Sequence, residues 1–89
     1  MNKAQPDAWE EKILKNFLDE DKLKTIPASH KKRMVILKWL VAKFEPEIRY
    51  PEANVNEIIQ RHHPDYATLR RELIIRGLMD RKGGVYWRI

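Results

Sequence analysis

The sequence predicts a mainly α-helical fold that ends in a small β-hairpin. Apolar residues recur at helical spacing in four segments, and capping residues or prolines mark the ends of these segments. Near the C-terminus, a Gly-Gly pair separates two short strand-like stretches. A chain of 89 residues is long enough for one compact core. We therefore expect a single α+β domain, with an N-terminal part over residues 1–28 and a core over residues 29–89.

The first helix is expected from about Asp7 to Leu18. Asp7 is a suitable N-cap, and Glu10 follows three positions later, as in a capping box. The apolar residues of this segment are spaced to form one face: Trp9, Ile13, Leu14, Phe17 and Leu18. The acidic residues 19–21 end the helix. Residues 23–26 are then expected to form a short extended edge segment, which Pro27 stops.

The second helix is expected from a cap at Ser29 to about Phe44. From Met34 onward it is apolar almost all round, which is typical of a helix at the centre of a core. Trp39 lies in the middle of this run, so we expect it to be mostly buried. A strand of some 16 residues would be unusually long, which favours the helix.

A short strand and two further helices follow. Residues 48–50 are expected to be extended because a proline follows them. The third helix starts at Pro51 or Glu52 and ends near His62, and Asp65 caps a fourth helix that runs to about Arg76. Gly77 is placed as a C-terminal stop.

The tail over residues 78–89 contains Gly83-Gly84, so it is expected to form a hairpin. From Ser29 onward, this order of elements is that of a winged helix-turn-helix, preceded by an extra N-terminal helix. Residues 65–76 then form the recognition helix and residues 78–89 the wing.

Residues 15–88 resemble a bacterial family known as domain of unknown function 2087. The segments that carry the resemblance include residues 16–19, 23–27, 31–33, 37–40, 44–46, 49–50, 55–58, 65–73, 77–81 and 84–88. The family is associated with transcriptional regulators, which implies contact with nucleic acid. Pro51 stands where the family usually has a threonine N-cap, so the start of the third helix is left open.

The net charge of +5 is concentrated in two segments. Residues 29–45 carry five basic and one acidic side chain, and residues 65–89 carry six basic and three acidic ones. Two basic segments are what a surface that binds a polyanion requires. The alternative is that the charge only keeps a basic domain soluble.

The period of the fourth helix predicts which of its side chains meet a partner. Thr68, Arg71, Glu72 and Ile75 fall on the side opposite the apolar face. Thr68 and Arg71 lie in the N-terminal half, where recognition helices meet base edges, and Ile75 suits a thymine methyl group or a protein partner. Glu72 is unfavourable near phosphates. Arg70 falls beside the apolar face, where it is expected to pair with an acidic residue, with a second interpretation as a DNA contact.

Further basic residues are candidates for phosphate contacts. Arg81 and Lys82 precede the Gly-Gly tip of the wing, where the alternative is a solvated turn. Lys31, Lys32 and Arg33 form the exposed first turn of the second helix, where positive charge opposes the helix dipole. Such contacts position a protein on DNA without reading its sequence.

Other chemistries find little support in the sequence. Cysteine is absent, Ser29 is expected to act as a cap, and the adjacent His62 and His63 lack the i, i+4 spacing of helical metal ligands. We therefore expect no catalytic residue, no metal and no cofactor. No apolar run is long enough for a membrane span, and the N-terminus lacks a signal-peptide core, so a cytoplasmic protein is expected.

Two functions of different classes follow. The first is a transcriptional regulator, or a module of one, that binds double-stranded DNA. The second is a winged helix that binds a protein partner, or a second copy of itself, without DNA. RNA binding and ligand sensing remain as further alternatives.

Overall fold

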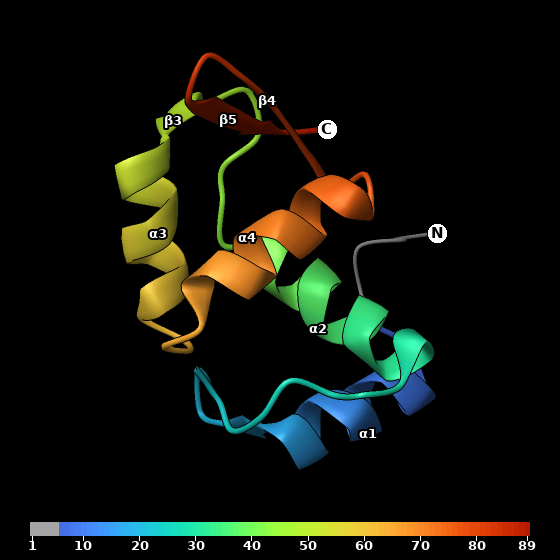
Figure 1. Cartoon of the computed structure of the whole chain (residues 1–89). Coiled ribbons are helices and arrows are strands. Elements are labelled where there is room, and N and C mark those ends of the chain that lie inside the picture. Colours follow the sequence, from blue (N-terminus) through green and yellow to red (C-terminus); the bar gives the residue numbers. More distant parts are fainter. Residues whose placement is uncertain (1–5) are drawn as a thin grey trace.

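The computed structural model describes residues 6–89 and confirms the α+β fold class. Residues 1–5, with which the expected N-terminal part begins, lie outside the described residues. Figure 1 shows the elements in chain order: α1 (Ala8–Phe17), β1 (Leu18–Asp19), β2 (Lys22–Leu23), α2 (His30–Val41), β3 (Tyr50–Pro51), α3 (Glu52–Gln60), α4 (Tyr66–Ile75), β4 (Met79–Lys82) and β5 (Val85–Arg88).

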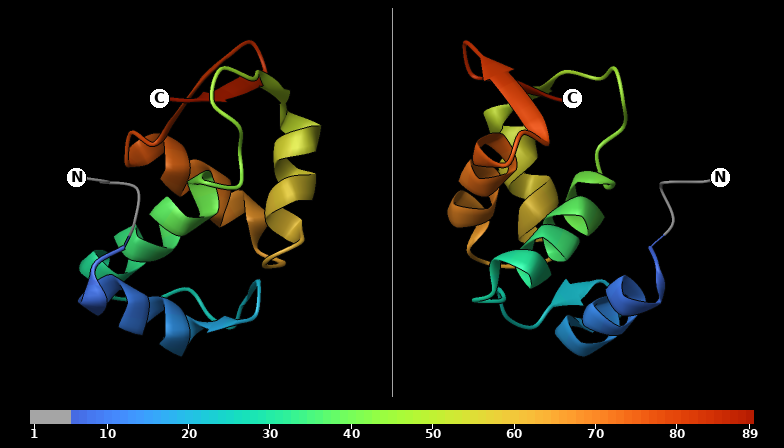
Figure 2. Two further views of the ribbon diagram at one scale, coloured as in Figure 1. Left: turned by 180° about the vertical axis from the view of Figure 1, so that it is seen from behind. Right: turned by 90° about the vertical axis from the view of Figure 1, so that its right-hand side faces the viewer.

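The elements from α2 onward have the order of a winged helix-turn-helix. Strands β4 and β5 form the expected hairpin, and β3 pairs with β5, so the strand order is β3-β5-β4. The pairing of Tyr50 with Tyr86 brings the short strand before α3 into the sheet. Figure 2 shows this sheet at one end of the helices α2–α4, with α1 at the opposite end.

The predicted caps are present. The Asp7 carboxylate accepts a hydrogen bond from the Glu10 backbone N–H, and the Glu10 side chain accepts one in return, which completes the capping box. The side chains of Ser29 and Asp65 cap α2 and α4. Gly77 follows α4 with a φ of +72°, a conformation that glycine adopts without steric cost.

Helix α2 ends earlier than expected, at Val41 rather than near Phe44. The next residues form a turn, in which the backbone N–H of Phe44 donates to the Val41 carbonyl. Phe44 still enters the core, where only 1% of its surface is exposed and its ring packs edge-on against Tyr50. Its burial explains the apolar pattern that made the helix look longer.

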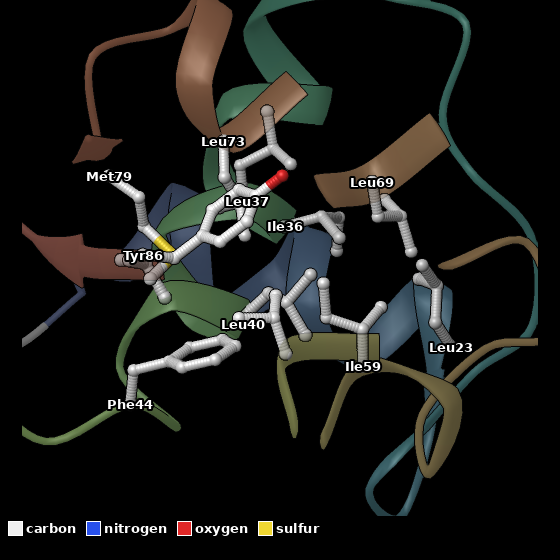
Figure 3. Close-up of a cluster of buried hydrophobic side chains, with 12 residues drawn as sticks. Leu23, Ile36, Leu37, Leu40, Phe44, Ile59, Leu69, Leu73, Met79 and Tyr86 are labelled. Atoms are coloured by element: carbon white, nitrogen blue, oxygen red, sulfur yellow. The ribbon is translucent and has the colours of Figure 1, made fainter. Parts of the chain in front are cut away.

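The core lies between α2, α3, α4 and the sheet (Figure 3). Its centre is α2, as predicted, with Ile36 and Leu37 fully buried. Trp39, which was expected to be mostly buried, packs against the margin of the core and is partly buried rather than fully enclosed. The rings of Trp39 and His62 form a T-shaped pair with centroids 5.1 Å apart, and the Lys43 ammonium lies 4.5 Å from the Trp39 ring centre.

The extended segment after α1 is shorter than predicted. Strand β2 ends at Leu23 and pairs with β1, a partner that the sequence analysis did not foresee. This hairpin is attached to the turn between α3 and α4. The Leu23 N–H donates to the His62 carbonyl, and the His62 Nδ1–H donates to the Asp21 carbonyl. His62 therefore has a structural role in joining the N-terminal part to the core.

Candidate nucleic-acid interface

The outward face of α4 contains three of the predicted contact residues. Arg71 is exposed, Ile75 is 72% exposed, and Thr68 is half-buried. The side chains opposite them, Leu69 and Leu73, are buried in the core. The helical period thus placed Arg71 and Ile75 correctly on the exposed side, whereas Thr68 is only partly exposed.

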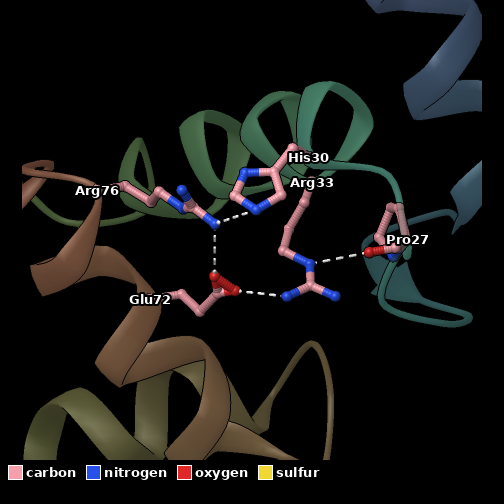
Figure 4. Close-up of polar contacts among 5 residues, drawn as sticks. All are labelled: Pro27, His30, Arg33, Glu72 and Arg76. Carbon is pink, nitrogen blue, oxygen red and sulfur yellow. Dashed lines mark hydrogen bonds and ion pairs between the residues drawn. The ribbon is translucent and has the colours of Figure 1, made fainter.

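The expectation that Glu72 faces outward is wrong. The residue is only 8% exposed, and its carboxylate lies between two arginines, 2.7 Å from Arg33 Nη1 and 3.5 Å from Arg76 Nη2 (Figure 4). The first turn of α2 packs against this side of α4 and covers it. The carboxylate is therefore neutralised and turned away from the outward face.

The same contacts correct the role predicted for Arg33. Its guanidinium donates hydrogen bonds to the Pro27 carbonyl and to Glu72 (Figure 4). Arg33 therefore makes contacts within the protein and is not a free phosphate-binding group. Next to it, Arg76 Nη2 lies 3.2 Å from His30 Nε2. The contacts between this turn of α2 and α4 thus involve His30 and Arg33. Lys31 and Lys32 are exposed, as expected, but they do not line the groove described below.

Arg70 has the structural surroundings that its position predicted. Its guanidinium donates to the Asn56 side chain, and its Nε lies 4.0 Å from the Glu52 carboxylate. The Arg70 side chain is 16% exposed. Arg70 therefore connects α4 to α3. Its guanidinium lies near the surface but already has partners within the protein.

The wing presents Arg81 and Lys82 as exposed residues of β4. Arg81 Nη1 lies 3.4 Å from the Tyr86 hydroxyl, and this hydroxyl donates to Glu52 at 2.7 Å. The hydrogen bond that Arg81 donates to the Tyr86 hydroxyl, together with its charge interaction with Tyr86, raises the pKa of Arg81. This arrangement connects the wing to the start of α3. This contact could not be predicted from the sequence, because only the pairing of β3 with β5 brings Tyr86 close to Glu52.

A groove of about 250 Å³ lies between α4 and the wing. Its lining residues come from α4, β4 and β5: Arg70, Arg71, Ile74, Ile75, Arg81 and Tyr86. Three of them are arginines, and none is acidic among the described residues that form the groove. The groove therefore combines positive charge with an apolar wall.

Two further properties concern the described chain as a whole. Across residues 6–89, no group of three or more histidine, aspartate or glutamate side chains is placed to hold a metal ion. Over the same residues, no helix is long and apolar enough to cross a lipid bilayer.

The fold and the groove define a small domain of winged helix-turn-helix type with a basic, partly apolar face on its fourth helix. The chain belongs to the bacterial family described as "Uncharacterized protein conserved in bacteria" (DUF2087), whose model matches residues 22–88. The match extends from β2 to β5. No curated protein and no solved structure matches the chain.

Proposed function

We propose that this chain binds double-stranded DNA as a regulator of transcription in the cytoplasm, and that it acts by binding rather than by catalysis. Helix α4 enters the major groove with Thr68, Arg71 and Ile75, and the wing contacts the backbone with Arg81 and Lys82. The proposal rests above all on the groove between α4 and β4, where basic side chains from both elements meet.

The charge distribution supports the proposal. In residues 65–89, the arginines that serve the fold have protein partners: Arg70 pairs with Asn56 and Glu52, Arg76 with Glu72, and Arg88 with the Phe44 carbonyl. Among the described residues, Arg71 and Lys82 have no ion-pair or hydrogen-bond partner for their side chains, and both are exposed. These two cations and Arg81 gain the most from contact with a polyanion.

The arrangement of acidic groups adds support. Glu72 would repel phosphates if it faced outward, but it is paired with two arginines on the α2 side of the helix. Asp65 is used as the N-cap of α4. The outward face thus presents positive and apolar groups, which suit phosphates and thymine methyl groups.

An electrophoretic mobility shift with random-sequence duplex DNA tests this proposal. The protein should retard the duplex at low salt and lose most of its affinity at moderate salt, because phosphate contacts release counterions. The variant Lys82→Glu should bind more weakly than the wild type. The control Lys12→Glu makes the same charge change on α1, at the opposite end of the molecule, and should bind better than Lys82→Glu. Absence of retardation at low salt contradicts the proposal.

A protein-binding function is the second candidate, and the exposure of Ile75 favours it. An isoleucine that is 72% exposed on the outward face of a helix suits an apolar partner surface as well as a base edge. Self-association that depends on concentration and is lost in Ile75→Glu, together with no binding to duplex DNA, would support this second function.

A further inference from the structure

We propose that the groove between α4 and β4 holds one backbone phosphate of the duplex, contacted from one side by Arg71 and from the other by Arg81. The inference rests on the proposed DNA binding and assigns the groove to the sugar-phosphate strand. It changes the role expected for Arg71 from a base contact to a phosphate contact.

The location of the groove is the first reason. A recognition helix enters the major groove, and a wing beside it reaches the backbone or the adjacent minor groove. The sugar-phosphate strand that separates the two DNA grooves must then pass between α4 and β4. In this protein, that position is the groove of about 250 Å³.

The available donors are the second reason. Arg71 and Arg81 both line the groove, one from the helix and one from the wing. A guanidinium has five N–H donors, and the Tyr86 hydroxyl takes up only one position on Arg81. Arg71 has no hydrogen-bond or ion-pair partner among the described residues. Both side chains can therefore donate to phosphate oxygens, a geometry for which arginine is well suited.

The surrounding charges are the third reason. Two carboxylates lie close to the groove arginines: Glu52 accepts from Tyr86 and lies 4.0 Å from Arg70, and Asp80 accepts from the backbone N–H of Arg81. This leaves Arg71 without an acidic neighbour that competes for its N–H groups. Tyr86 is 1% exposed and holds Arg81 through its hydroxyl, so the wing arginine is positioned before DNA arrives.

A consequence concerns how bases are read. If Arg71 binds a phosphate of the DNA backbone, Thr68 and Ile75 are the outward residues that remain available to contact base edges. A hydroxyl contacts several base edges, and an isoleucine side chain packs against the thymine methyl group. Specificity then depends on Thr68 and Ile75, whereas Arg71 contributes affinity for every sequence.

The test is a salt titration of binding to a random-sequence duplex, on which base-specific contacts are absent. Four proteins are compared with the wild type: Arg71→Gln, Arg81→Gln, the double variant, and Lys12→Gln as a control of equal charge change on α1. Thermal melts are run in parallel to verify that each variant folds, which is expected because all three positions are exposed.

Each single variant should bind the random duplex several-fold more weakly. The double variant should lose about one unit of the slope of log K against log salt, because one phosphate accounts for about 0.9. At 0.1 M salt, this corresponds to a loss of about eightfold in affinity. Lys12→Gln should keep the slope of the wild type.

Two results would overturn the inference. Unchanged binding of Arg71→Gln to random duplex would show that Arg71 does not contact the backbone. A decrease of about two units in the slope of the double variant would assign the two arginines to separate phosphates. Failure of the wild type to bind any duplex is a distinct result, which overturns the proposed function together with the inference.

Discussion

The Glu72 carboxylate lies 2.7 Å from the Arg33 guanidinium, across the contact between α4 and α2. The two residues are 39 positions apart in the sequence. Arg76, the C-cap residue that follows α4, approaches the same carboxylate from one turn further along the chain. One acidic side chain, 11% exposed, thus holds two arginines at the junction of two core helices.

This relationship predicts that Glu72→Gln destabilises the protein. The substitution keeps the shape of the side chain but leaves Arg33 and Arg76 close together without a counter-charge. We expect the free energy of unfolding to fall by about 1–3 kcal/mol, measured by urea denaturation. Glu57→Gln is the matched control, because Glu57 forms a well-exposed pair with Arg61, and it should change stability by less than about 0.5 kcal/mol. Equal effects of the two substitutions would contradict the role given to Glu72.

The margin position of Trp39 predicts a moderate effect of its removal. Trp39→Ala should destabilise by about 2 kcal/mol, below the 3–5 kcal/mol typical of a fully buried tryptophan, because part of the ring already contacts solvent. Leu37→Ala, at a position with no exposed surface, should cost about 2–5 kcal/mol, and Trp9→Ala, at a position that is 46% exposed, much less. Thermal melts of the three variants should follow this order. A larger loss in Trp9→Ala than in Leu37→Ala would show that α2 is not the centre of the core.

The turn of the wing provides a prediction about backbone conformation alone. Gly83 and Gly84 have φ values of +59° and +78°, and a Cβ at either position would meet no atom within 4 Å. Gly84→Val should therefore destabilise the hairpin through its left-handed conformation, by about 1–2 kcal/mol, and leave the helices intact. Gly83→Asn should be tolerated, because asparagine adopts positive φ and Asn-Gly favours this type of turn. The rate of backbone amide hydrogen exchange in β4 and β5 distinguishes Gly84→Val from Gly83→Asn. Equally fast exchange in the two variants would contradict this explanation.

Substitution of Arg70 is predicted to lower stability, whereas substitution of Arg71 is predicted to weaken DNA binding. Arg70→Ala should lower the free energy of unfolding by about 1–2 kcal/mol, because it leaves Asn56 and Glu52 without their partner. Arg71→Ala should change stability by no more than about 0.5 kcal/mol but weaken duplex binding. Each variant is measured by thermal melt and by duplex titration. Similar stability losses in both would mean that Arg71 also has a partner inside the fold.

The order of elements could be predicted from the sequence because it depends on local signals. Asp7 and Asp65 cap helices through bonds to residues three positions away, and Gly77 needs only its own backbone conformation. Such features require no knowledge of distant segments.

The errors involve contacts between segments that are distant in the sequence. The helical period of α4 shows which side is opposite to Leu69 and Leu73, but it cannot show that α2 covers Glu72. For the same reason, Arg33 was placed with Lys31 and Lys32 rather than inside the contact between the helices. The groove itself has lining residues from α4 and the wing, and only the three-dimensional arrangement brings Arg71 and Arg81 to opposite sides of it.

The central claim is that α4 and the wing form the surface that binds duplex DNA. The most direct measurement is the change in backbone amide NMR shifts when a random-sequence duplex is added to the isotope-labelled protein at low salt. The account predicts that the largest shifts cluster at Thr68, Arg71, Ile75, Arg81 and Lys82, while residues of α1 remain unchanged. Shifts concentrated on α1, or no shifts at a protein concentration that saturates non-specific binding, would contradict it.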